Sequence, residues 1–280
     1  MDLIYEVMNV LLPFEWTSHT FMKHAFLAIL LVTPLFGLLS TMVVSNKMAF
    51  FSDSLGHGAF TGIAIGVLFG SFSPLLSLII FSVVFALFIT YIKNKSTAST
   101  DTIIGVFSST AIALGLMIMS YGGGFNKFSA FLIGDILSIS ENDIASLLVV
   151  FIVILVSWGY LFNRLLVMSL NASFARSRGI ANFWTEGIFA SLLAIVVSIS
   201  IQWVGILIIN ALLVLPAAAA RNVTNNVKQY HIVSVLIALI SGVAGLILAY
   251  YFNMAAGATI VVLSALIFFI TLPLKAYFVR

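Results

Sequence analysis

Long apolar runs separated by short polar connections extend along the whole chain. Nine such segments cover approximately residues 24–45, 50–70, 74–92, 101–120, 142–162, 183–201, 204–220, 231–252 and 257–277. A helix needs about 20 apolar residues to cross the hydrocarbon core of a bilayer. The seventh segment is shorter and predicts a broken or partly re-entrant helix, so eight or nine spans are the alternatives. The pattern predicts an all-α polytopic membrane protein with one transmembrane domain over residues 1–280.

Basic residues are distributed unequally between the two sets of connections. With nine spans, the side of the membrane that holds the N-terminus carries only Lys23 and Lys127, although the chain has 12 Lys and Arg residues in all. The positive-inside rule makes the richer side cytoplasmic. We therefore expect the N-terminus outside and the C-terminus in the cytoplasm.

The composition supports the same class of protein. Hydrophobic residues make up 62% of the chain and charged residues 8%, against about 25% charged residues in soluble domains. The absence of cysteine excludes disulfides and thiolate ligands. No H-E-x-x-H, G-x-S-x-G or G-x-x-x-x-G-K-[ST] motif occurs. The chain is therefore not expected to be an enzyme, and any ATPase that drives it must be a separate protein.

Asp53 and His57 are unusual because they lie inside an apolar segment, four residues apart. On a helix this spacing puts both side chains on one face, with Thr61 continuing it. An aspartate at the centre of a membrane helix costs about 2.5–3.5 kcal/mol, so ionisable residues there are usually functional. Carboxylate oxygen and imidazole nitrogen suit zinc or manganese. A pair that only fixes helix packing is the alternative, and four ligands would require a second copy of the helix.

Small residues run beside this pair at four-residue spacing. They are Ser54, Gly58, Gly62 and Gly66. Such a stripe lets a neighbouring helix approach closely, so we expect this helix to pack against protein.

Other polar residues are weaker candidates. Glu15 and His19 repeat the four-residue spacing near the outer mouth, where interfacial anchoring beside Trp16 is the alternative to metal binding. Asn210 lies in an apolar run before Pro216 and is a candidate for supporting a path or bonding to a neighbouring helix.

The longest non-apolar stretch between spans covers residues 163–182 and is cytoplasmic in this topology. Asn171 or Ser173 is expected to cap a short helix that ends at Gly179. Such a helix can dock a partner protein or serve as a plain connector.

Five stretches resemble the membrane permeases of bacterial ABC importers for zinc, manganese and iron. They are MAFFSDSLGHGAFTGIAIG (48–66), DTIIGVFSSTAIALGL (101–116), FLIGDILSIS (131–140), VGILIINALLVLPAAAAR (204–221) and AAGATIVVL (255–263). One departure is Gly58, followed by Phe60 and Thr61, where many members have Ala or Ser and then a bulkier residue. The resemblance covers nearly the whole chain.

The resemblance implies a permease homodimer in the bacterial cytoplasmic membrane, two cytoplasmic ATPase subunits and an extracytoplasmic metal-binding protein. Asp53 and His57 would line the path of Zn²⁺ or Mn²⁺, with Fe²⁺ also admitted, zinc slightly favoured and no cofactor permanently bound. Residues 170–180 would form the coupling helix that docks on the ATPase, with Phe174, Arg176 and Gly179 as its coupling residues. A stand-alone gradient-driven metal transporter is the alternative, and an intramembrane hydrolase lacks any supporting motif.

Overall fold

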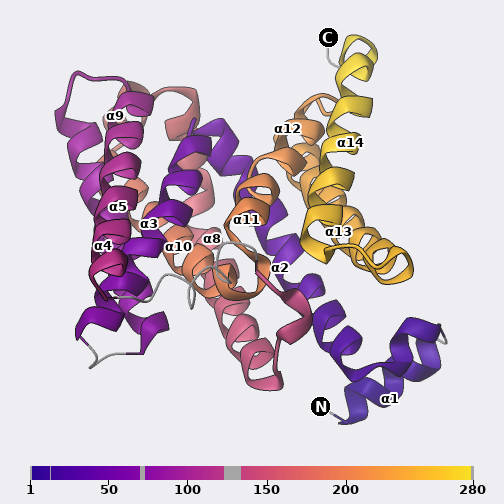
Figure 1. Cartoon of the computed structure of the whole chain (residues 1–280). Helices are drawn as coiled ribbons and strands as arrows, with labels where there is room; N and C mark the ends of the chain where they lie inside the picture. The colour runs from indigo at the N-terminus through magenta and orange to yellow at the C-terminus, as the bar shows by residue number, and fades with distance from the viewer. Residues whose placement is uncertain (1, 13, 70–72, 123–133, 279–280) are drawn as a thin grey trace. The chain divides into compact units, whose positions relative to one another are not determined.

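The computed structural model describes residues 2–12, 14–69, 73–122 and 134–278, and every regular element in these ranges is a helix (Figure 1). The elements are α1 (Asp2–Leu11), η1 (Glu15–Ser18), α2 (Thr20–Ser45), α3 (Ala49–Phe69), α4 (Pro74–Lys95), α5 (Thr100–Gly122), η2 (Ile136–Ser138), α8 (Glu141–Leu170), α9 (Ala172–Ser177), α10 (Asn182–Val204), α11 (Ile206–Leu212), α12 (Leu215–Arg221), α13 (Val227–Phe252) and α14 (Ala256–Phe278). The η elements are short 3₁₀ helices.

Seven helices in the described ranges are long and apolar enough to cross a membrane, namely α2, α4, α5, α8, α10, α13 and α14. Helix α3 is 21 residues long but contains Asp53 and His57 and is not one of the seven. The predicted all-α polytopic fold is therefore confirmed.

The segment predicted as a broken helix is indeed broken. Helix α11 ends at Leu212, and α12 begins at Leu215 with Pro216 in its first turn. Proline lacks an amide proton and its ring collides with the carbonyl four residues earlier, so a helix cannot continue undistorted through this position. Because each piece has seven residues, neither alone is long enough to span a bilayer.

Helix α8 runs further than its apolar segment. The sequence pattern ends the span near residue 162, whereas α8 continues to Leu170. Leu165 is buried, and the Arg164 guanidinium lies 4.0 Å from the centre of the Tyr160 ring. Apolar packing and this cation–π contact extend the helix past its first basic residue.

The chain forms two compact units. Unit 1 comprises Met1–Thr41, Gly134–Val153 and Trp203–Arg280, and unit 2 comprises Met42–Ile133 and Ile154–Gln202. Each unit is made from separate stretches of the chain. The single permease domain expected over residues 1–280 stays a prediction.

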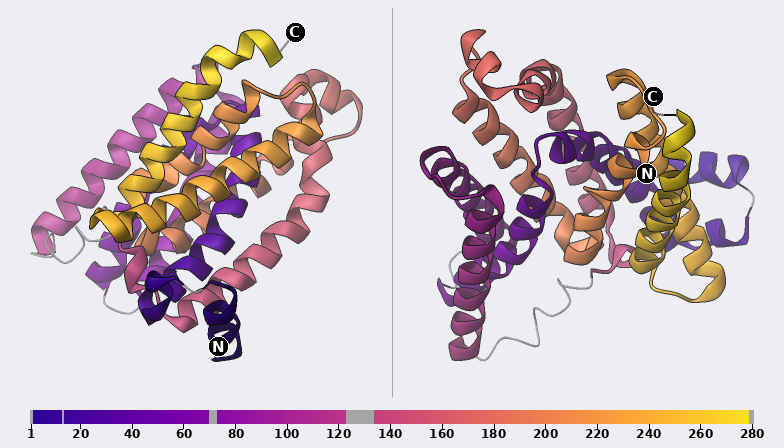
Figure 2. Two further views of the ribbon diagram at one scale, coloured as in Figure 1. Left: turned by 90° about the vertical axis from the view of Figure 1, so that its right-hand side faces the viewer. Right: turned by 90° about the horizontal axis from the view of Figure 1, so that it is seen from above.

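In unit 1, α13 and α14 form an antiparallel pair that lies side by side in both views of Figure 2. Asn253 ends α13 in the left-handed conformation (φ 51°), which turns the chain sharply into α14. Helix α2 packs against α13 through small residues. The Ser40 and Ser234 hydroxyls lie 3.0 Å apart, and a Cβ atom at Gly37 would lie 2.8 Å from the Cα atom of Val235.

In unit 2, α3 packs against α4 and α5 (Figure 1). A Cβ atom at Gly62 would lie 3.0 Å from the Cα atom of Leu78, and one at Gly66 would lie 2.7 Å from the Cβ atom of Ser77. The predicted small-residue stripe is therefore a close contact with α4.

We expect Gly115→Ala to destabilise the protein by about 1–3 kcal/mol, the usual cost of overpacking. Gly115 of α5 faces α3, and a Cβ atom there would lie 2.8 Å from the Thr61 Oγ1 atom and 3.1 Å from the Thr61 backbone nitrogen. Thermal unfolding of purified protein, followed by tryptophan fluorescence, measures the effect. Gly105→Ala is the matched control, because it lies in the same helix and its Cβ atom would meet nothing within 4 Å. An unfolding temperature of Gly115→Ala equal to or higher than that of the unchanged protein would contradict the close contact between Gly115 and Thr61.

Candidate functional site

Asp53 and His57 lie one turn apart on α3. The His57 Nε2 atom is 3.5 Å from the Asp53 Oδ1 atom, and the side chains are 37% and 45% exposed for His57 and Asp53, respectively. Neighbouring positions on the helix are buried against α4 and α5. The pair therefore occupies the part of α3 that these two helices leave uncovered.

The pair offers one carboxylate and one imidazole to a cation. Among the described residues, no group of three or more His, Asp or Glu side chains is close enough to hold a metal ion. In that part of the chain, a single copy thus supplies two protein ligands of this kind. Structural zinc sites are closed by four protein ligands, so these two leave the coordination of a metal ion incomplete.

Thr61 does not continue the exposed face of the pair. Its side chain is buried, and its hydroxyl donates a hydrogen bond to the Ala111 carbonyl oxygen of α5. The helix turns by 100° per residue, so the second i, i+4 step from Asp53 drifts toward the neighbouring helix. The geometry favours support over a place on a path.

Asn210 is half-buried in α11, within the broken segment. It belongs to unit 1, whereas Asp53 and His57 belong to unit 2. Its suggested role in supporting a path stays a prediction.

Glu15 and His19 do not share a helical face. Glu15 begins η1, and His19 follows that helix in extended conformation before α2 starts. Glu15 lines a cavity of about 560 Å³, while the His19 ring stacks on Phe21 with ring centres 5.4 Å apart. Trp16 is only 2% exposed and packs inside the protein, and the interfacial anchoring suggested for Glu15 and His19 stays a prediction.

The predicted short helix is present as α9. The Asn171 side chain accepts hydrogen bonds from the backbone nitrogens of Ser173 and Phe174, at 2.9 and 3.0 Å. Gly179 follows the helix at φ +77°, as the capping pattern predicts. Both ends of α9 are therefore defined by local contacts.

The side chains of α9 differ in their surroundings. Phe174 is 49% exposed, and the Arg178 guanidinium lies 5.1 Å from the centre of its ring. Arg176 lines a cavity of about 640 Å³ together with Lys47, Lys93 and other residues of unit 2. The helix thus presents an aromatic side chain outward and a basic one to a polar cavity.

An ion pair that sequence reasoning missed borders the same cavity. Lys93 of α4 forms a hydrogen-bonded ion pair with Glu186 of α10, and the Asn94 amide donates to the same carboxylate at 3.2 Å. Glu186 lies inside the predicted span 183–201, and an acidic residue in a membrane span is normally paired with a basic one. Its position in the sequence could therefore have indicated an ion pair. Its partner lies 93 residues away in the chain.

Comparisons with known proteins extend over nearly the whole chain. The sequence model of the ABC 3 transport family matches residues 18–275. The high-affinity zinc uptake system membrane protein ZnuB of Buchnera aphidicola is 29% identical over 247 residues, which are 88% of this chain and 94% of that protein. The manganese transport system membrane protein MntC of Listeria monocytogenes is 26% identical over 253 residues, which are 90% of each chain.

A solved structure is similar over a comparable length. It is described as PsaBC from Streptococcus pneumoniae in complex with Fab, and it has a TM-score of 0.81 and 27% sequence identity to this chain. The match covers 99% of this chain and 98% of that chain. Both compact units therefore have counterparts in that structure.

Proposed function

Because the chain belongs to the ABC 3 transport family, we propose that it is the membrane-spanning permease subunit of an ATP-driven importer of divalent metal ions. The relatives named for zinc and manganese uptake support this proposal, since each matches along most of its length. ATP hydrolysis is assigned to a separate cytoplasmic subunit. An extracytoplasmic binding protein delivers the metal.

The Asp53–His57 pair is the observation that carries the proposal. Both side chains are close to half-exposed in the first half of α3, a helix whose other faces are packed. An ionisable pair in a membrane segment normally marks a transport path, because an apolar pair would be cheaper there. We assign these residues as the metal ligands of the path.

A homodimer completes the ligand set. Two protein ligands bind a transition metal weakly, whereas two copies of α3 facing each other would supply two carboxylates and two imidazoles. Zinc or manganese is the proposed cargo, with zinc slightly favoured, and Fe²⁺ is compatible with the same ligands.

Helix α9 is the proposed contact with the ATPase. Its exposed Phe174 is an apolar knob of the type that fills a groove on a partner. The capped N-terminus and the left-handed Gly179 give it a defined direction, which transmission of a movement requires.

The expected orientation places α9 and the C-terminus in the cytoplasm. Single cysteines replacing Lys95 and Ser177 should react with a membrane-impermeant maleimide only after the membrane is opened, and one replacing Glu15 should react in intact cells. The chain contains no native cysteine, so the labelling background is low. Labelling of Ser177→Cys in intact cells would reverse the orientation and remove the proposed ATPase contact.

Metal uptake tests the function directly. A bacterial strain that lacks its own zinc and manganese importers receives this permease with its ATPase and binding protein. We expect accumulation of Zn²⁺ or Mn²⁺ that is lost when the catalytic glutamate of the ATPase is replaced. Accumulation that persists without the ATPase would instead indicate a gradient-driven carrier.

A further inference from the structure

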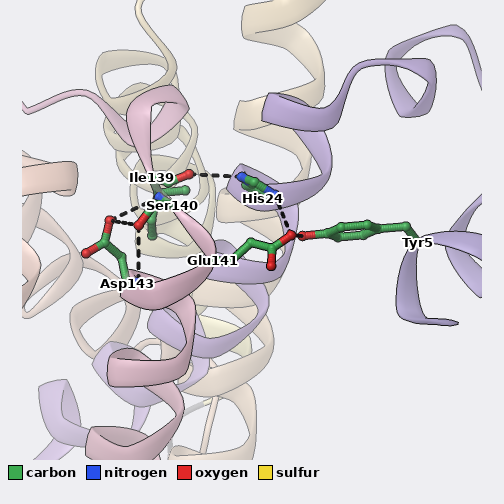
Figure 3. Close-up of polar contacts among 6 residues, drawn as sticks. All are labelled: Tyr5, His24, Ile139, Ser140, Glu141 and Asp143. Atoms are coloured by element: carbon green, nitrogen blue, oxygen red, sulfur yellow. Dashed lines mark hydrogen bonds and ion pairs between the residues drawn. The ribbon is translucent and has the colours of Figure 1, made fainter. Parts of the chain in front are cut away.

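A second polar cluster lies in unit 1, whereas the proposed transport pair belongs to unit 2. Figure 3 shows Tyr5 of α1, His24 of α2 and Glu141, the first residue of α8, meeting at one carboxylate. The Tyr5 hydroxyl donates a hydrogen bond of 3.1 Å to Glu141 Oε1. The His24 Nε2 atom lies 3.9 Å from the same oxygen.

The tautomer of His24 follows from its other contact. Its Nδ1 atom lies 3.0 Å from the Ile139 carbonyl oxygen (Figure 3). A carbonyl oxygen can only accept, so Nδ1 carries the proton and the lone pair of the neutral ring is on Nε2. Histidines that bind metals are commonly held in this way, with the second ring nitrogen donating to a carbonyl.

The Nε2 atom is placed for a cation. It is buried, and no hydrogen bond reaches it from the residues that the structure describes. Its lone pair and the Glu141 oxygen are two acceptors, which repel each other unless a positive charge lies between them. A separation of 3.9 Å is too long for a hydrogen bond. A metal ion bonded to both atoms at about 2.1 Å in tetrahedral geometry would bring them to about 3.4 Å from each other, so a side-chain shift of about 0.5 Å would let both bind one ion.

The start of α8 keeps Glu141 available for this role. Ser140 and Asp143 form a capping box, in which the Ser140 backbone nitrogen and hydroxyl donate to Asp143 Oδ2 at 3.0 and 2.6 Å. The Asp143 carboxylate is therefore engaged in capping the N-terminus of α8. The Glu141 side chain is half-exposed and turned toward His24 instead (Figure 3).

We propose that His24 and Glu141 form a second divalent-metal site, with the Tyr5 hydroxyl beside it. Imidazole nitrogen and carboxylate oxygen select a transition metal such as Zn²⁺ or Mn²⁺, and water completes the coordination. The site lies near the start of α2 and at the start of α8. The Lys23 ammonium, 5.7 Å from the centre of the Tyr5 ring, adds a positive charge nearby and weakens metal binding. Such a site exchanges its ion readily.

The experiment measures metal binding without transport. Full-length protein in nanodiscs carries Asp53→Ala and His57→Ala, so the transport pair contributes nothing. Equilibrium dialysis with elemental analysis counts bound Zn²⁺, and electron paramagnetic resonance measures free Mn²⁺. We expect one weakly bound metal per chain. Adding His24→Gln or Glu141→Gln should weaken binding by about tenfold or more, since even indirect partners of a ligand cost this much.

His19→Gln is the matched control, because His19 lies in the same region but stacks on Phe21 instead of facing a carboxylate. Thermal unfolding of each variant confirms that it is folded. Unchanged binding in folded His24→Gln and Glu141→Gln variants would overturn the site. If the protein carrying only Asp53→Ala and His57→Ala binds no metal, and the added His24→Gln or Glu141→Gln change lowers its thermal stability, the two residues form an ordinary imidazolium–carboxylate pair. That outcome also overturns the proposed metal site. Since transport is not measured, these outcomes are independent of the proposed function.

Discussion

Metal uptake is expected to fall to the background of permease-free cells when Asp53 or His57 is replaced by alanine. Each change removes half of the ligands that one copy contributes, and in a homodimer it removes two of the four. A loss of this size is expected because the two remaining protein ligands would bind the metal ion only weakly. Uptake of ⁶⁵Zn²⁺ or ⁵⁴Mn²⁺ by the complemented strain measures the effect.

The two side chains are exposed enough that the variants should still fold. At 45% and 37% exposure, neither residue fills a packed core position, so the amount of permease in the membrane should stay near normal. Asp101→Ala is the control for removing an exposed carboxylate from the same unit, and it should transport normally. Normal uptake by well-expressed Asp53→Ala and His57→Ala variants would make the pair structural.

Phe174→Ala and Gly179→Val should separate ATP hydrolysis from uptake while leaving metal binding intact. Removal of an aromatic anchor at the centre of an interface typically costs about 2 kcal/mol, roughly thirtyfold in affinity. Gly179→Val forces a β-branched residue to φ +77°, where nothing within 4 Å would clash with its Cβ atom. Its cost of about 1–2 kcal/mol is therefore conformational and changes the exit of the chain from α9.

Conservative variants distinguish docking from general damage. Phe174→Leu keeps an apolar knob, and Gly179→Asn keeps the left-handed conformation, because asparagine tolerates it. Both should retain most of the coupling. Co-purification of the ATPase and hydrolysis stimulated by loaded binding protein are the two measurements. Wild-type values for Phe174→Ala and Gly179→Val in both would reduce α9 to a connector.

Local features of the fold were predictable from the sequence because their causes are local. Apolar runs predict helices since a backbone in lipid must satisfy its hydrogen bonds within the segment. Pro216 predicts the break between α11 and α12, and Asn171 with Gly179 predicts the ends of α9. In each case the physical reason acts within a few residues.

Contacts between residues far apart in the sequence could not be predicted and became visible in the folded chain. Thr61 turns to α5, Glu186 pairs with Lys93, and His24 faces Glu141, although 50, 93 and 117 residues separate the partners. A membrane sequence contains many apolar residues on every helical face, so its pattern does not say which face meets which neighbour. The helices, the broken segment and the ionisable pair on α3 could thus be predicted from local sequence patterns. Packing of the helices decided which polar side chains meet, since that depends on close approach at small residues such as Gly62 and Gly115.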